Sequence, residues 1–277
     1  MKNKTLIAAL AVAGMVGVTA NAQALVFGYY LSGASGSPAA AITAAGHTAQ
    51  QLINLTAGDL VGIDVLWILN GNNRDPDANV MNNVANISSF VNGGGVLSFH
   101  DRNVNDGPSS ASAYIAGAAG VTFVRDFNDD AEIEVLVTNT VTNGPGGVID
   151  NTSLDGGSSS SHGYALLATL PAGATAVLSQ GDATHIVDFY YSVGLGDVYY
   201  STIPLDYYFG GYGGAGVQAN MTQVYAVNEA AFQAELARGN GAGNGGGNGG
   251  NGVPEPGILG LLGLGIAALG WSRRKSA

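Results

Sequence analysis

Residues 63–101 read "IDVLWILNGNNRDPDANVMNNVANISSFVNGGGVLSFHD". The segment begins with a nearly unbroken apolar run, which is typical of a strand covered on both faces in a parallel sheet. Asp75 suits a helix N-cap and Pro76 a first helical position, and four apolar residues then share one helical face, at positions 80, 84, 87 and 91. Three glycines end the helix before a second buried strand. The segment therefore predicts a strand–helix–strand unit with a right-handed crossover.

The chain on either side extends this α/β pattern. Upstream, we expect strands at residues 24–33 and 47–55 around a short helix at 38–45. Downstream, strand-like runs separated by Gly, Pro and Asp turns occupy residues 131–141, 174–180, 185–193 and 196–203. A final helix is expected at residues 228–239. The runs 185–193 and 196–203 are joined by Gly-Leu-Gly, which predicts a hairpin. We expect a mostly parallel sheet with helices on both faces and antiparallel additions in the second half.

The first residues predict a secretory signal. Two early lysines precede an apolar stretch at residues 5–18, and small residues allow cleavage after Ala22 or after Ala24. We assign residues 1–22 to a signal peptide. It implies contact with a signal peptidase and the export machinery, and it is excluded from the fold.

Charge and cysteine content exclude several functions. Residues 23–252 carry four arginines against nineteen acidic side chains, a net charge of −15. Such a body repels phosphate backbones, so we expect no nucleic-acid partner. The whole chain lacks cysteine, which excludes disulfides, thiolate metal sites and a cysteine nucleophile.

A flexible linker and an apolar C-terminal segment follow the globular domain at 23–238. Residues 239–252 hold nine glycines, four asparagines and one alanine, which predicts a flexible linker with an r.m.s. span of roughly 20 Å. Fifteen uncharged residues, 257–271, then precede a basic cluster. A bilayer core takes about 20 residues, but a shorter helix is accommodated by thinning and snorkelling. The basic cluster suits a cytoplasmic end, so we expect a short transmembrane helix.

The tail has a specific resemblance. Pro254, Glu255 and Pro256, the short Gly/Leu helix and a cluster containing Arg273 and Arg274 resemble the PEP-CTERM sorting signal of Gram-negative bacteria. Residues 253–277 are assigned to that signal. The resemblance implies an exosortase partner, an integral-membrane cysteine peptidase that cleaves near Pro-Glu-Pro. It also implies a transient inner-membrane intermediate and final delivery to the cell surface or extracellular matrix.

The body resembles the class I glutamine-amidotransferase-like, or trehalose-utilisation-like, group over roughly residues 25–228. The resemblance lies in four segments: "IDVLWILNG", "FVNGGGVLSFHD", "TNGPGG" and "GLGDVYYSTIPLDYYFGG". It implies a flavodoxin-like fold. Amidotransferases of the group place a cysteine nucleophile on the turn after the GGG-led strand. This chain has Phe99, His100 and Asp101 there, so glutamine hydrolysis by that route is excluded because no thioester can form.

Another chemistry at the same sheet edge stays open. His100 and Asp101 end a predicted strand, where ligands bind in open α/β folds. His162 and Asp206 lie in later loops that can converge there. Together they suggest a divergent hydrolase, with a histidine–aspartate pair as general base or a histidine/aspartate set that holds a metal. Local hydrogen bonding in turns is the simpler explanation for three of these residues, and no spaced catalytic motif accompanies them.

One loop has the oxygen ligands of a calcium site. Asp126, Asn128, Asp130 and Glu132 alternate as in many calcium loops. The loop glycine is absent, and Val137 stands where a bidentate acid is needed. We expect no cofactor, with calcium as the one alternative, and a solvated turn explains the loop without it.

The last strands are rich in tyrosine, at positions 190, 191, 199, 200, 207, 208 and 212. Aromatic faces stack on sugar rings, but tyrosine is also a good strand residue. The sequence therefore favours a non-enzymatic surface or matrix protein that binds extracellular polysaccharide. A divergent hydrolase and a calcium-dependent adhesin are the alternatives.

Overall fold

The computed structural model describes residues 23–104, 110–126, 132–157 and 160–241. Its largest sheet has a parallel half in which the strands lie in the order β2-β1-β3-β4-β12. The bounds are β1 (Val26–Ser32), β2 (Thr48–Gln51), β3 (Val65–Asn70), β4 (Val96–Asp101) and β12 (Gly196–Ser201). All six residues of β3, β4 and β12 are buried, as the apolar runs predict.

The antiparallel half continues from β12. The next strands in order are β11 (Asp182–Val193), β10 (Thr175–Gln180) and β6 (Ile133–Val135). Two further strands, β9 (Gly163–Leu166) and β5 (Phe123–Arg125), pair with β11 and with each other, and β7 (Asn143–Gly144) forms a separate hairpin with β8 (Gly147–Val148). The hairpin predicted from the Gly-Leu-Gly junction is confirmed as β11–β12, which lies in the middle of the sheet between β4 and β10.

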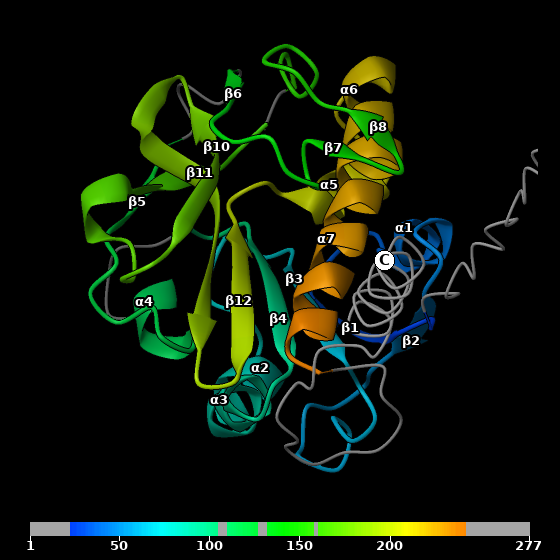
Figure 1. Cartoon of the computed structure of the whole chain (residues 1–277). Coiled ribbons are helices and arrows are strands. Elements are labelled where there is room, and N and C mark those ends of the chain that lie inside the picture. The colour runs from blue at the N-terminus through cyan, green and yellow to red at the C-terminus, as the bar shows by residue number, and fades with distance from the viewer. Residues whose placement is uncertain (1–22, 105–109, 127–131, 158–159, 242–277) are drawn as a thin grey trace, which may run out of the picture.

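Helices cover both faces of the parallel half (Figure 1). One face packs against α1 (Ala39–Ala44) and α7 (Ala226–Gly239), and the other against α2 (Ala78–Asn82), α3 (Val84–Asn92) and α4 (Ala111–Tyr114). The remaining helical elements are α5 (Leu205–Phe209), α6 (Ala215–Ala219), the π-helical η2 (Asn220–Tyr225) and the 3₁₀ turn η1 (Leu167–Thr169). The expected α/β fold of flavodoxin-like type, with antiparallel additions, is confirmed.

Two local predictions differ from the structure. The helix N-cap is Asp77 rather than Asp75, because the Asp77 carboxylate accepts hydrogen bonds from the backbone of Asn79 and Val80. The strand expected at 131–141 shortens to β6. The chain turns at Asn139, whose side chain accepts a hydrogen bond from the Val141 backbone, so the strand cannot continue.

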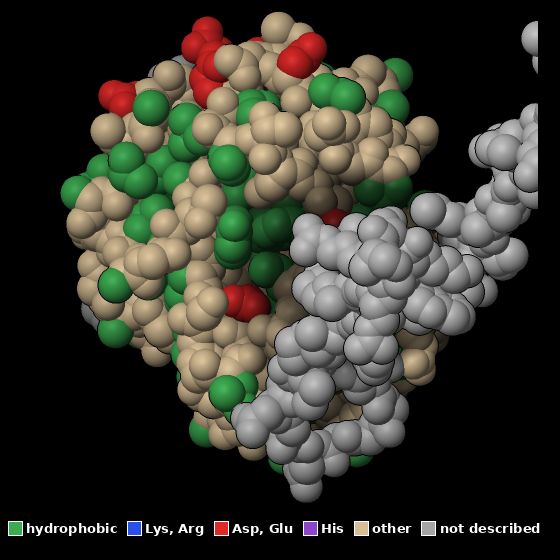
Figure 2. Space-filling view, viewed as in Figure 1, with side chains coloured by type: hydrophobic (Ala, Val, Ile, Leu, Met, Phe, Trp, Pro, Cys, Tyr) green, Lys and Arg blue, Asp and Glu red, His purple; other side chains and the backbone are tan. Residues whose placement is uncertain are grey.

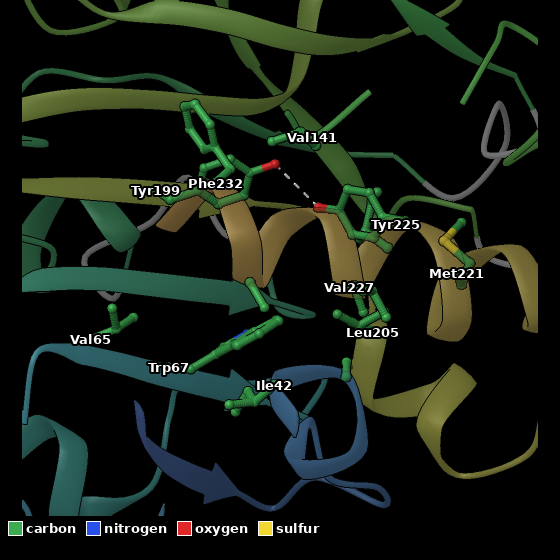
Figure 3. Close-up of a cluster of buried hydrophobic side chains, with 14 of the residues drawn as sticks. Ile42, Val65, Trp67, Val141, Tyr199, Leu205, Met221, Tyr225, Val227 and Phe232 are labelled. Carbon is green, nitrogen blue, oxygen red and sulfur yellow. Dashed lines mark hydrogen bonds between the residues drawn. The ribbon is translucent and has the colours of Figure 1, made fainter. Parts of the chain in front are cut away.

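The sheet separates two cores. Alternate residues of each central strand face opposite sides, so Val65 and Trp67 face α7 whereas Leu66 and Ile68 face α2 and α3. Figure 3 shows the α7 side, where Trp67 packs below the helix and the hydroxyls of Tyr199 and Tyr225 lie 3.4 Å apart. Polar groups are therefore buried within this core.

Candidate functional site

The carboxyl ends of the parallel strands meet at one edge of the sheet, where open α/β folds bind ligands. The segments after β1, β4 and β12 bring a group of polar and aromatic side chains together there, and two of its members lie in α5 rather than in the loop expected for Asp206. We call this group the carboxyl-edge cluster, and its members are Ser35, Arg102, Asp206, Tyr207 and Tyr212.

Asp206 is the buried centre of the cluster. Its side chain is 2% exposed, and its Oδ2 accepts a hydrogen bond from Arg102 Nη1 at 3.2 Å. Ser35 Oγ lies 3.3 Å from the same oxygen and 3.1 Å from the Asp206 carbonyl oxygen. Burial raises the pKa of Asp206, and the Arg102 charge and the Ser35 bonds oppose that rise. The carboxylate is therefore a fixed acceptor in a low-dielectric position.

Two glycines permit the close approach of these loops. A Cβ on Gly36 would lie 2.3 Å from the carbonyl carbon of Phe209, and a Cβ on Gly71 would lie 2.4 Å from Ala34 Cα. The Gly71 Cβ would also lie 2.8 Å from Asp206 Oδ2. Larger side chains at either position would push the loop that carries Ser35 away from Asp206.

The aromatic side of the cluster is partly open to solvent. The Arg102 guanidinium carbon lies 5.5 Å from the centre of the Tyr207 ring, in cation–π range. Tyr207 stacks on Tyr212 with ring centroids 5.0 Å apart and an interplanar angle of 24°. Tyr212 is 53% exposed, whereas Tyr191, Tyr199, Tyr200 and Tyr208 are core residues. Most of the tyrosines singled out from the sequence thus serve packing, and Tyr212 presents an aromatic face.

His162 lies beside this cluster rather than in it. Its side chain is buried and its Nδ1 donates a hydrogen bond to the Arg102 carbonyl oxygen at 2.8 Å. Burial, together with the charges of Arg102 and Arg125, lowers the pKa of His162 to about 4, although the bond to Arg102 opposes this shift. His162 is therefore neutral at pH 7. Arg125 also donates to the Arg102 carbonyl oxygen, at 3.2 Å, so both side chains hold the loop after β4.

His100 and Asp101 end β4, as expected, but they point to opposite faces of the sheet. His100 stacks on Trp67 in the α7 core, and Asp101 accepts from Tyr114 and Tyr200 in the other core. The reason is the two-residue period of a strand. The two side chains therefore do not form the histidine–aspartate pair that the sequence suggested. Among the described residues, neither of them forms a hydrogen bond with Asp206.

The Asp101 carboxylate is buried and its hydrogen-bonding capacity is used by neighbouring side chains and backbone. Asp101 is 0% exposed and accepts from Asn70, the Asn103 backbone, Tyr114 and Tyr200 over distances of 2.9–3.2 Å. Burial raises the pKa of Asp101, and these four donors oppose the rise. Because both carboxylate oxygens are occupied, the visible role of Asp101 is to tie β4 to β3, β12 and α4.

Sequence reasoning missed the partner of His100. Glu229 of α7 is 0% exposed, and its Oε2 lies 2.9 Å from His100 Nε2. His100 Nδ1 donates to the Ile203 carbonyl oxygen, and Ser98 and Gln233 donate to Glu229 Oε1. Burial by itself would lower the pKa of His100, but the charge and hydrogen bond of Glu229 raise it overall. The only sequence signal was an acidic residue among the apolar positions of the last helix.

A second buried acid lies in the same core. Asp188 of β11 accepts hydrogen bonds from Tyr199 at 2.7 Å and Tyr225 at 2.6 Å. Burial raises its pKa to about 6, against the bonds from its hydroxyl donors. Tyr225 comes from the π-helical segment η2, which directs its hydroxyl toward β11 and β12. Asp188, Tyr199 and Tyr225 are each 0% exposed, so these residues form a buried network.

The expected calcium loop falls only partly within the described residues. Asp126 and Glu132 are described, whereas Asn128 and Asp130 lie outside the described residues. In the part of the chain that the structure describes, no three His, Cys, Asp or Glu side chains are grouped to hold a metal. The calcium site stays a prediction.

Acidic side chains gather at the end of the molecule where β6 and β10 lie (Figure 2). The described part of that face shows no lysine or arginine side chain. Two of the four arginines of the body, Arg102 and Arg125, instead lie together at the carboxyl edge. This edge therefore concentrates the scarce positive charge of an acidic protein.

Residues 252–275 match the family model of the PEP-CTERM protein-sorting motif. The chain carries a PEP-CTERM sorting motif. The match includes Pro254, Glu255, Pro256, Arg273 and Arg274, all of which lie outside the described residues. The motif supports export and processing by an exosortase. Across residues 23–104, 110–126, 132–157 and 160–241, no helix is long and apolar enough to cross a bilayer, and the expected transmembrane segment falls outside these ranges.

Solved structures share the fold of the body. Two cytoplasmic proteins of Salmonella typhimurium, STM3548 and STM1381, are similar to this chain at 12% and 10% sequence identity, each with a TM-score of 0.52. The similarity covers 76% of this chain in both cases, and 97% and 99% of those proteins. Likeness at such low identity shows the fold alone. No curated protein sequence matches the chain, and the amidotransferase-like resemblance stays a prediction.

Proposed function

We propose that the body of this exosortase-sorted, exported protein is a non-enzymatic module that binds extracellular polysaccharide through the carboxyl-edge cluster. The observation that carries the proposal is the exposed face of Tyr212. It lies on Tyr207, which in turn covers the Arg102–Asp206 ion pair. An aromatic face near a fixed, partly exposed donor suits a sugar ring, which has apolar C–H faces and hydroxyl edges.

Each member of the cluster has a separate part in this binding. The Tyr212 ring stacks on a sugar face and Tyr207 holds it in place. Arg102, whose side chain is 19% exposed, donates to the hydroxyls at the rim of the ring, and the buried Asp206 carboxylate holds the guanidinium in place. Ser35 keeps the Asp206 carboxylate in position through its hydrogen bond at 3.3 Å. A few fixed polar groups beside an apolar surface are the usual composition of a small-molecule site.

Binding is better supported than hydrolysis by the positions of the histidines. A divergent hydrolase needs water and substrate to reach His100 or Asp101, and these residues are 2% and 0% exposed. His162 is also 2% exposed, and it holds the Arg102 carbonyl oxygen. The cluster around Tyr212 needs no such opening.

The test compares two tyrosines of the same body. Tyr212→Ala removes the exposed ring of the cluster, and Tyr164→Ala removes a half-buried ring on β9 that stacks on His185. We expect soluble polysaccharides of the native matrix, cast into affinity gels, to retard the chain 23–252. Tyr212→Ala should weaken binding about tenfold, as expected for the loss of about 1.4 kcal/mol, with little change in melting temperature.

Tyr164→Ala should bind like the unaltered chain. Binding that survives Tyr212→Ala, or that both variants weaken equally, would rule out the cluster as the site. A chain that no matrix polysaccharide retards would rule out the proposed function. Release of reducing ends during the assay would instead support the hydrolase.

A further inference from the structure

Both ends of the described chain lie at the edge of the sheet opposite the carboxyl-edge cluster. Arg238, in the last turn of α7, donates to the carbonyl oxygen of Gln23 at 3.3 Å. Asn240 donates to Asp197 at 2.9 Å, and Asp197 pairs in register with Val96, the first residue of β4. The mature N-terminus and the start of the linker therefore leave from the amino ends of the parallel strands.

The length of the continuous helix formed by α6, η2 and α7 gives the separation between the two edges of the sheet. It runs without interruption from Ala215 to Gly239, which is 25 residues. At the rise of helical residues this is about 35 Å, from the neighbourhood of Tyr212 to the neighbourhood of Asn240. Figure 1 shows the helix along the full height of the sheet, with α6 at its upper end and α5 beside its middle, where α5 contacts η2. The cluster and the linker are thus at opposite poles of the body.

The remaining linker is short compared with this separation. Fifteen residues, 242–256, connect the described chain to the apolar tail. A Gly-rich chain of that length has an r.m.s. span of roughly 20 Å. Turning the cluster toward a membrane would require the linker to run the height of the body. The linker would then span about 35 Å, well above its r.m.s. length and about two-thirds of its contour of about 50 Å, which is an improbable extension.

We infer that the carboxyl-edge cluster faces away from the membrane for as long as the tail remains uncleaved, and that the amino edge with Leu195 faces the lipid surface. Leu195 is 64% exposed in the β11–β12 turn. This turn lies close to the start of the linker, because a Cβ on Gly94 would be 3.8 Å from the Leu195 carbonyl oxygen and 3.7 Å from the Asn240 carbonyl oxygen. The inference rests on the proposed membrane attachment of the tail. Its consequence is that the protein can hold an extracellular polymer before exosortase cleavage as well as after it.

The absence of cysteine from the chain allows a direct test. Leu195→Cys and Ala215→Cys each place one fluorescent probe at an exposed position, the first at the amino edge and the second at the start of α6. The chain 23–277 is incorporated into phosphatidylethanolamine/phosphatidylglycerol vesicles with nitroxide headgroups, and the chain 23–252 is the control. We expect quenching several-fold stronger at position 195 than at 215, and none in the control.

The outcomes separate the inference from its premises. Equal quenching at the two positions, or stronger quenching at 215, would overturn the orientation. Failure of the chain 23–277 to float with the vesicles would overturn membrane attachment and the inference with it. Vesicle-bound chain that captures a matrix polysaccharide as well as soluble 23–252 supports the outward-facing site. Vesicle-bound chain that loses that capture argues against it. A chain that captures none in either form but keeps the quenching difference would contradict only the polysaccharide proposal.

Discussion

Replacing His100 by alanine removes one partner of a charge pair inside the α7 core. His100 and Glu229 are 2% and 0% exposed, and their closest atoms are 2.9 Å apart. A carbonyl oxygen only accepts, so the Ile203 carbonyl requires a proton on His100 Nδ1. The 2.9 Å contact between His100 Nε2 and Glu229 Oε2 holds a second proton, and the Glu229 charge, which raises the pKa of His100, favours the position of that proton on the histidine. The alanine variant leaves a buried carboxylate held only by Ser98 and Gln233.

The expected cost follows from this burial. Breaking a buried pair by removing one partner lowers the free energy of unfolding by about 3–5 kcal/mol. Glu229→Gln should cost much less, about 1 kcal/mol, because the amide keeps the shape of the side chain. Its oxygen can accept from Ser98 and Gln233, and its NH₂ can donate to a neutral His100. In the Glu229→Gln background, His100→Ala should then lose at least about 1 kcal/mol less than it does alone.

Urea unfolding of the chain 23–252 at pH 7 measures all three variants. His185→Ala is the matched control, because this half-buried histidine on β11 stacks on Tyr164, and the acid that interacts with it, Asp182, is exposed rather than buried. It should cost less than about 1 kcal/mol. The pH dependence gives a second readout. Since the folded pKa of His100 is raised, its contribution is complete below the unfolded pKa of about 6.5 and falls as the pH rises through the folded pKa.

Equal costs for His100→Ala and His185→Ala would refute this reasoning, as would strict additivity with Glu229→Gln. The result also decides how activity data are interpreted. A His100→Ala protein that has lost a hydrolytic activity must first be shown to be folded, because the structure places this histidine in the core.

Asp188→Asn should stabilise the chain at pH 7 by up to about 3 kcal/mol, because burial raises the pKa of this acid to about 6. When the pH falls from 6 to 4, the unaltered chain should gain about the same amount of stability relative to the variant. Gly71→Ala should lower the free energy of unfolding by about 1–3 kcal/mol and weaken polymer binding. Gly216→Ala, whose Cβ meets nothing within 4 Å in helix α6, should leave binding unchanged and raise the free energy of unfolding by up to about 1 kcal/mol. If the loop that begins at Asp126 binds calcium, added calcium should raise the melting temperature and Asp126→Ala should abolish the rise; an unchanged melting temperature would count against the site. Intact mass of protein recovered from the cell surface should end near Pro254–Pro256, and a full-length C-terminus in every fraction would contradict exosortase cleavage.

The sequence by itself determined the elements whose cause is local. The apolar runs of β3 and β4 fixed two strands buried on both faces, and the spacing of Val80, Ile87 and Val91 fixed the helical face between them. The PEP-CTERM motif was also legible, because a sorting signal is recognised as a linear segment. The two-residue period of a strand also implies that the adjacent residues His100 and Asp101 face opposite sides of the sheet. The expectation that they form a pair, which rests on their adjacency in the sequence, overlooks this period.

Only the tertiary structure decided which distant groups meet. Glu229 is 129 residues from His100 in the chain, and Asp206 is 104 from Arg102. No periodicity encodes such a pair, because it depends on the β11–β12 hairpin placing β12 next to β4 and on α7 crossing that same face. The location of Tyr212 beside Arg102 and Asp206, and of both chain ends at the opposite edge, has the same origin. Local sequence sets where strands and helices form, but packing of whole elements across the sheet decides which polar side chains become neighbours.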